Sequence, residues 1–149
     1  MVVVERSVLV EFSADEMRGL VQDVDSYPKF LPWCSGASVK TDADGDVMAT
    51  IEINFRGIRQ QFTTRNTAAT DAPIQSVHMK LVVGPFKSLD GEWRFQALTP
   101  EASKVTLHLN YEFSSRILEK AIGPVFRHIT DTLVEAFVQR ARAMRMDKA

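Results

Sequence analysis

The 149-residue sequence predicts an α+β domain in which a curved antiparallel β-sheet wraps around one long C-terminal helix. Two observations carry this prediction. Between residues 47 and 113, apolar and polar residues alternate along successive segments, which is typical of strands with one buried and one solvated face. From residue 118 to about 144 the apolar residues recur at steps of three and four, which predicts one helix of about thirty residues. A sheet with one apolar face needs a cover, and only this helix has an apolar stripe long enough.

The N-terminal part predicts a strand followed by a short helix. Residues 2–10 are β-branched and apolar, which favours a strand. Ser13 fits the cap of a helix, because its hydroxyl can accept from the Glu16 N–H while the Glu16 side chain answers the Ser13 N–H. The helix is expected to end before Pro28, because a proline disfavours helical geometry in the residue that precedes it.

Five or six one-sided strands follow in succession. The alternating segments are residues 47–55, 58–66, 77–81, 89–97 and 105–113, and Asp44-Gly45 is a hairpin turn signal ahead of the first of them. Consecutive strands of this kind predict an antiparallel sheet. Strand, short helices, sheet and long helix in this order are the helix-grip arrangement. Gly123-Pro124 lies inside the last helix and predicts a kink there or the separation of its first turn.

Composition and charge narrow the function classes. A chain of this length is expected to form one domain, residues 1–149, with a sizeable core. The net charge of −1 and the pI near 6.3 argue against broad electrostatic binding of nucleic acid, and no DNA partner is expected. The single cysteine, Cys34, excludes an internal disulfide. Glu5 and Arg6 interrupt the only early apolar run, so neither a signal peptide nor a spanning helix is expected, and we predict a cytoplasmic protein.

Residues 27–34, which read YPKFLPWC, are unusual because they combine two prolines with three aromatic rings. Such a run is a poor helix interior and a poor central strand, yet its side chains are costly to leave in water. We expect it to lie as a stiff apolar flap over the open end of the gripped helix. Further rings fall on the inward strand faces, where they either fill the core or line a pocket for a hydrophobic ligand. These inward rings are Phe55, Phe62, Trp93, Phe95 and Tyr111.

Two motifs resemble those of a known family. Residues 27–34, together with the run Gly84-Pro85-Phe86-Lys87-x-Leu89-x-Gly91-x-Trp93-x-Phe95, are similar to the coenzyme Q-binding protein and ribosome-association toxin family of START-like domains. An older label for this family is oligoketide cyclase or lipid-transport protein. The resemblance covers essentially the whole chain. Because the motifs are common to both functional branches, the fold transfers better than the function.

The resemblance implies a non-enzymatic binder of an isoprenoid quinone, ubiquinone, that supports respiratory quinone function. The ligand would lie between sheet and helix, and transient membrane contact would place the protein at the periphery of the inner membrane. Tyr111 is the best inward hydrogen-bond donor to a carbonyl. The turn at Gly84-Pro85-Phe86 is either a second rim of the pocket or an ordinary hairpin loop. The expected ligand contacts are Phe30, Leu31, Trp33, Phe55, Phe62, Phe86, Trp93, Phe95, Tyr111, Phe126, Ile129 and Leu133.

The other branch of the family binds the large ribosomal subunit and blocks joining of the subunits. A local basic surface would be needed for contact with RNA phosphates. The candidates are Arg140, Arg142 and Arg145, which cluster with Lys148 near the end of the last helix. Further basic positions on the outward strand face or its edge are Arg56, Arg59 and Arg65. Basic residues near a helix C-terminus also simply complement its dipole. The sequence leaves both interpretations open.

A third interpretation is a polyketide cyclase-like enzyme, for which catalytic residues are few. His78 and His108 alternate with apolar neighbours and are expected to point outward, and Cys34 has no base beside it in the sequence. The three histidines lack ligand spacing with Cys34 or a carboxylate. We therefore expect no chemistry on the ligand, no metal and no cofactor other than the bound quinone.

Overall fold

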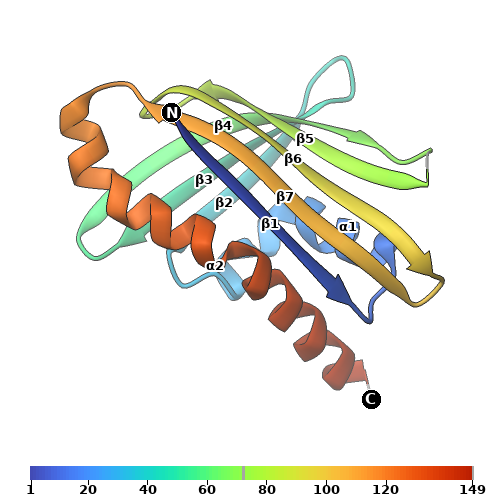
Figure 1. Ribbon diagram of the computed structural model, residues 1–149. Coiled ribbons are helices and arrows are strands. Elements are labelled where there is room, and N and C mark those ends of the chain that lie inside the picture. Colours follow the sequence, from blue (N-terminus) through green and yellow to red (C-terminus); the bar gives the residue numbers. More distant parts are fainter. Residues whose placement is uncertain (72, 149) are drawn as a thin grey trace.

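The computed structural model describes residues 1–71 and 73–148 of the chain. Its elements follow the predicted order, with a strand, short helices, six further strands and a long helix (Figure 1). They are β1 (Val2–Val10), α1 (Ala14–Gln22), the 3₁₀ helix η1 (Val24–Lys29), β2 (Cys34–Thr41), β3 (Val47–Phe55), β4 (Ile58–Ala69), β5 (Ile74–Val83), β6 (Phe86–Thr99), β7 (Ala102–Phe113) and α2 (Arg116–Lys148).

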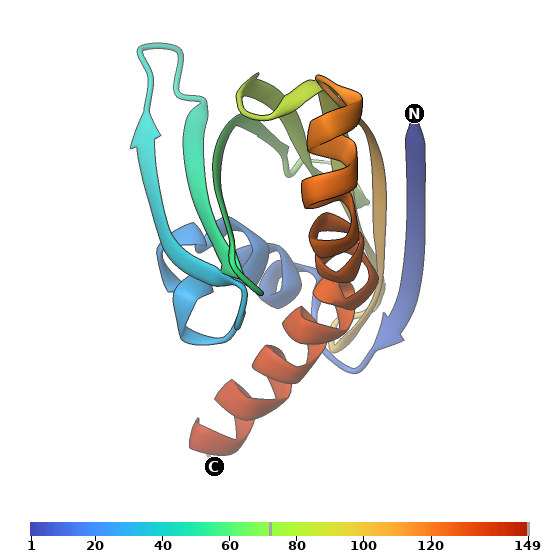
Figure 2. The same ribbon diagram turned by 90° about the vertical axis from the view of Figure 1, so that its left-hand side faces the viewer.

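The strands form one antiparallel sheet with the order β1-β7-β6-β5-β4-β3-β2. Figure 2 shows the sheet curving around α2, which lies on its concave side. Alternation along each strand places apolar residues on that side, as in β7, where Leu107 and Leu109 are buried while His108 is exposed. The helix-grip α+β prediction is confirmed.

The short helices differ in part from the expectation. Ser13 caps α1, because the Glu16 N–H donates to Ser13 Oγ at 3.0 Å, but the Glu16 carboxylate lies 3.7 Å from the Arg145 guanidinium instead of reaching back to the cap. α1 ends at Gln22, and the chain then continues as η1, which includes Pro28. A 3₁₀ turn accepts proline because its φ lies in the range to which the proline ring is fixed.

Proline is also accepted inside α2. The helix runs without interruption from Arg116 to Lys148, so the separation of its first turn at Gly123-Pro124 does not occur. The carbonyl of Lys120 is the group that loses its helical N–H partner, and both Lys120 and Pro124 are exposed. Water can therefore satisfy that carbonyl, which removes the main penalty of a proline at this position.

Two apolar clusters fill the space between the sheet and α2. The first lies against the N-terminal half of α2 and contains Phe86, Tyr111 and Phe126. The second lies against the C-terminal half and contains Trp93 and Phe137. The candidate functional site lies where the two clusters meet.

Candidate ligand-binding cavity

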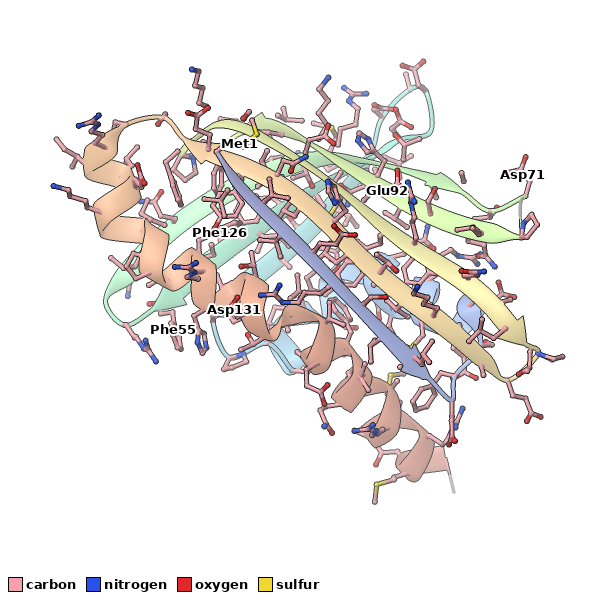
Figure 3. All side chains as sticks on the ribbon, viewed as in Figure 1. Met1, Phe55, Asp71, Glu92, Phe126 and Asp131 are labelled. Carbon is pink, nitrogen blue, oxygen red and sulfur yellow. The ribbon has the colours of Figure 1, made fainter. Side chains whose placement is uncertain are left out.

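A cavity of about 90 Å³ lies between the concave face of the sheet and α2. Its walls come from η1, the strands β3 to β7 and α2, and they include side chains from both apolar clusters. Phe126 reaches into the space between α2 and the sheet (Figure 3). Because nearly all of the lining is apolar, the cavity suits an apolar occupant.

Six of the sequence-predicted contact residues line this cavity. Aromatic rings come from four elements, so that the cavity is enclosed by rings on the sheet side as well as on the helix side. Trp93 and Phe137 lie edge to face with ring centroids 5.4 Å apart and close the end nearest to the second cluster. The predicted residues in the lining are Trp33, Phe62, Trp93, Phe126, Ile129 and Leu133.

The other predicted contact residues lie outside the cavity wall. Phe86 and Tyr111 pack on Phe126, with ring centroids 4.9 and 4.7 Å away, and so form a plug between the cavity and the start of α2. Phe95 is fully buried beside Trp93 in the second cluster.

Three more of the predicted contact residues also lie outside the cavity wall, namely Phe55, Phe30 and Leu31. Phe55 stacks on His128 of α2 at 5.1 Å and is capped by the guanidinium of Arg56, so it joins the β3–β4 hairpin to the helix (Figure 3). Phe30 lies edge to face with Phe137 at 5.3 Å, and Leu31 is buried in the first cluster.

Residues 27–34 form a fixed wall of the core, which differs from the flap that the sequence suggested. Leu31, Trp33 and Cys34 are buried, and the Tyr27 hydroxyl donates to the carbonyl oxygen of Val21 at the end of α1. Its ring also contacts Phe137, with centroids 5.4 Å apart. The prolines are accommodated because Pro28 lies in η1 and Pro32 lies at the exposed surface, where neither has to donate a ladder hydrogen bond.

Three polar residues in the lining were missed by the sequence analysis. Thr64 and Thr130 are buried, and Asn66 is half-buried at the edge of the cavity. Thr64 Oγ1 donates to Asn66 Oδ1 at 2.7 Å, and Thr130 Oγ1 donates to the Arg127 carbonyl at 3.1 Å. The signal was present for two of them, because residues 64 and 66 share the face of β4 that Phe62 occupies.

Burial raises the pKa values of two ionisable groups near the cavity, Tyr27 and Cys34. It raises the pKa of the Tyr27 hydroxyl far above its usual value, with the nearby Cys34 and Asp23 adding to the shift. Burial also raises the pKa of the Cys34 thiol, which donates to the Gly36 carbonyl at 3.3 Å. A neutral, hydrogen-bonded thiol is a poor nucleophile.

The histidines lie away from the cavity. His78 and His108 are on the outer face of the sheet, where His78 Nε2 is 3.0 Å from Asp90 Oδ1. The described residues contain no cluster of three or more side chains that could hold a metal ion. None of the helices in the described part combines the length and the hydropathy that crossing a bilayer requires.

The arginines expected to contact RNA are engaged within the protein. Arg145 donates to the Glu11 carbonyl at 2.9 Å and lies 4.0 Å from the Phe12 ring centroid. Arg142 lies 3.9 Å from Glu135, and Arg140 lies over the Phe30 ring at 5.2 Å. Arg145 and Arg140 therefore contribute to the attachment of the helix end, whereas the partner of Arg142 lies within α2 itself.

Comparison with known families identifies the protein family of this chain. Residues 10–138, from the last residue of β1 into the C-terminal half of α2, match the family model described as polyketide cyclase / dehydrase and lipid transport. The chain belongs to this family. Its relatives within this family include ribosome association toxins and a coenzyme Q-binding protein, the two groups that the sequence motifs resemble. The resemblance is therefore confirmed.

One such relative is the ribosome association toxin RatA of Vibrio cholerae, which is 45% identical over 93% of this chain and 94% of its own length. Another is the mitochondrial coenzyme Q-binding protein COQ10 homolog B of Xenopus laevis, at 24% identity over 91% of this chain and 56% of that protein.

Solved structures agree on the fold. The 18 kDa protein CC1736 of Caulobacter crescentus is 30% identical, with a TM-score of 0.74 over 97% of this chain and 99% of that chain. A START superfamily protein from Mycobacterium smegmatis has a TM-score of 0.73 over 95% of this chain and 98% of that chain, at 20% identity. The second likeness supports the fold alone.

Proposed function

We propose that this member of the family binds an apolar small molecule between the sheet and α2, and that the ligand is an isoprenoid quinone such as ubiquinone. The observation that carries the proposal is the ring-lined cavity at Trp33, Phe62, Trp93 and Phe126. Aromatic rings can stack on a quinone head, and the aliphatic lining suits a prenyl tail. The name of the COQ10 relative supports the same ligand.

The polar lining supplies a position for the quinone carbonyl. Because Asn66 Oδ1 accepts from Thr64, the Asn66 amide N–H₂ group is oriented as a donor at the edge of the cavity. Tyr111, the donor expected from the sequence, lies outside the lining among the rings of the plug. In this proposal Asn66 takes the role first assigned to Tyr111.

The cavity has to widen to accept this ligand. Its volume of about 90 Å³ is below the roughly 150 Å³ of an apolar cavity that holds benzene and far below the usual volume of a ligand pocket. We propose that α2, with Phe126, moves away from the sheet rings Phe86 and Tyr111 when the ligand enters. No step of chemistry is proposed, because Cys34 is neutral and the histidines lie outside the cavity.

The test is to fill the cavity without disrupting the core. Ala49 lines the cavity and is buried on β3, so Ala49→Leu adds apolar volume where space exists. The protein would be purified without detergent from its own host, extracted with organic solvent and analysed by mass spectrometry. Ala97→Leu, at an exposed position of β6, is the matched control.

We expect nearly one quinone per protein molecule in the wild type and in the control variant Ala97→Leu. Ala49→Leu should contain little quinone, although all three proteins are folded. An empty wild-type extract would rule out a tightly held quinone. Equal quinone in both variants would show that the ligand binds elsewhere.

Association with the large ribosomal subunit is the second candidate, and the RatA relatives at 41 to 45% identity favour it. Binding through arginines to RNA phosphates should weaken steeply between low and high salt, whereas retention of a quinone should hardly change. Sedimentation of the protein with purified large subunits across a salt series tests this. Failure to sediment at low salt would exclude the second candidate and leave the first untouched.

A further inference from the structure

One end of the molecule exposes an unusual amount of apolar surface. Six of the eleven exposed large apolar side chains of the described residues gather there, on three separate elements. Ile117 is 80% exposed, Val83 63% and Val3 61%. We call this set the end patch. It consists of Met1, Val2 and Val3 at the start of β1, Val82 and Val83 at the end of β5, and Ile117 at the start of α2.

The strand register explains why these residues meet. Val2 pairs with Tyr111 near the end of β7, and Phe86 pairs with Phe113 two residues further along the same strand. The Ser114 N–H and the Ser114 hydroxyl then each donate to the Pro85 carbonyl at 3.1 Å. The starts of β1 and α2 and the turn after Val83 are therefore held at one end, on the left of Figure 1 and at the top of Figure 2.

Three positive side chains lie at the starts of β6 and α2, next to the end patch. Lys87, Arg116 and Lys120 are exposed beside it, and Glu119 is the acidic residue in the first turn of α2. The opposite end carries carboxylates in its turns, including Asp71, which Figure 3 shows far from Met1. The opposite end also carries exposed arginines, Arg142 and Arg145, but there they are mixed with carboxylates, whereas Glu119 is the one carboxylate in the first turn of α2 beside the three cations of the apolar end. The charge at the apolar end therefore complements a negatively charged surface.

We propose that this end of the protein docks on the surface of an anionic lipid bilayer. Exposed apolar side chains rimmed by cations are typical of surfaces that enter the headgroup region while Lys and Arg contact the lipid charges. The patch lies on the ends of strands and of a helix and not in a groove or on a flat face, which suits shallow insertion better than a protein partner. Cations in the rim select the anionic leaflet.

The end patch is continuous with the wall of the cavity. Val83 leads through Gly84 and Pro85 to Phe86, whose ring contacts Phe62 and Phe126, and both of these line the cavity. A ligand leaving a docked bilayer would therefore meet the apolar side chains of the first cluster, Phe86 and Phe62 among them, before it reached the cavity. This route rests on the proposed ligand binding, whereas the docking itself does not.

Flotation of the full chain with vesicles tests the docking. Vesicles of phosphatidylcholine, with or without phosphatidylglycerol and without quinone, are mixed with the wild type and with the double variant Val83→Asp/Ile117→Asp. The control is Leu9→Asp/Leu98→Asp, whose positions are 69% and 50% exposed and lie at the other end of β1 and of β6. We expect the wild type and the control to float with the anionic vesicles, and the end-patch variant to lose roughly tenfold in partitioning.

Several results would overturn the docking. They are a wild type that does not float, equal flotation with neutral vesicles, or equal losses in the two double variants. Urea unfolding of each variant shows that a loss is not caused by misfolding, because all four positions are exposed. Quinone content is measured separately by extraction, so failure of docking and failure of ligand binding give different results.

Discussion

Gly84 lies where the turn between β5 and β6 packs closely against Phe62 of β4. A Cβ placed there would lie 2.6 Å from Phe62 Cβ and 3.4 Å from Phe62 Cα, and neither atom can rotate away. We predict that Gly84→Ala lowers the free energy of unfolding by about 1 to 3 kcal/mol, because the added methyl group overpacks the hairpin against β4. The midpoint and slope of urea unfolding measure this change.

Gly19 provides the control for Gly84. It lies exposed in α1, and a Cβ there meets nothing within 4 Å. Gly19→Ala is therefore expected to raise the free energy of unfolding by up to about 1 kcal/mol through helix propensity. If both substitutions changed stability in the same direction, the contact between Gly84 and Phe62 would not be the cause of the first effect.

Tyr27 makes stability depend on alkaline pH. Its hydroxyl donates to the Val21 carbonyl and its pKa is raised by burial, so the folded state favours the neutral phenol. Stability from a raised pKa is complete below the unfolded value of about 10 and is lost as the pH rises above it. Tyr27→Phe should cost about 1 kcal/mol at pH 7, and the difference from wild type should nearly vanish at about pH 11, since each pH unit removes about 1.4 kcal/mol.

Urea unfolding of wild type and Tyr27→Phe at the two pH values provides the measurement. Deprotonation of the lysines affects both proteins alike, so only the difference between them matters. A difference that stays constant with pH would mean that the Tyr27 hydroxyl ionises equally easily in the folded and unfolded chains.

Beyond the apolar packing of the second cluster, Arg145 attaches the C-terminal end of α2 to the corner between β1 and α1. Arg145 contacts the Glu11 carbonyl, the Phe12 ring and the Glu16 carboxylate, whereas Arg142 makes one exposed ion pair with Glu135. We predict that Arg145→Ala lowers the free energy of unfolding by about 1 to 2 kcal/mol and that Arg142→Ala changes it by less than about 0.5 kcal/mol. Thermal unfolding compares the two, and equal effects would contradict the attachment.

The elements were predictable because each has a period, but the contacts between elements were not. Alternation in residues 105–113 places Leu107 and Leu109 inward in sequence and structure alike. The same alternation cannot distinguish Trp93, which lines the cavity, from Phe95, which is buried in the second cluster. Both rings point inward, and only the curvature of the sheet and the path of α2 decide which one borders free space.

Residues 27–34 illustrate a second limit of prediction. Proline chemistry excluded a long helix or a central strand there, which the structure agrees with, but the 3₁₀ turn and the Tyr27 hydrogen bond depend on where α1 ends in space. Likewise the sequence shows that Arg145 is basic, and only the fold shows that it lies over Phe12. Local chemistry determined what each segment could be, and tertiary contacts determined what it packs against.

At the scale of the whole molecule, the small cavity makes ligand binding and stability inseparable. A ligand that enters has to move α2 and Phe126 away from the sheet rings Phe86 and Tyr111. In the proposed function it binds the folded chain only, so it stabilises the fold by mass action. At a free concentration 100 times its dissociation constant, this stabilisation is about 2.7 kcal/mol. For a chain of this length that corresponds to a rise in Tm of roughly 8 °C.

We therefore predict that protein stripped of ligand by unfolding in organic solvent and refolding has a lower Tm than the protein as purified. Addition of a short-chain ubiquinone should restore the difference in the wild type and in Ala97→Leu. Ala49→Leu should start with an equal or higher Tm, because it fills space already present, and should gain nothing from the quinone. If Ala49→Leu gained as much as the wild type, the quinone would be binding to a surface other than the cavity, since occupied volume cannot be filled twice.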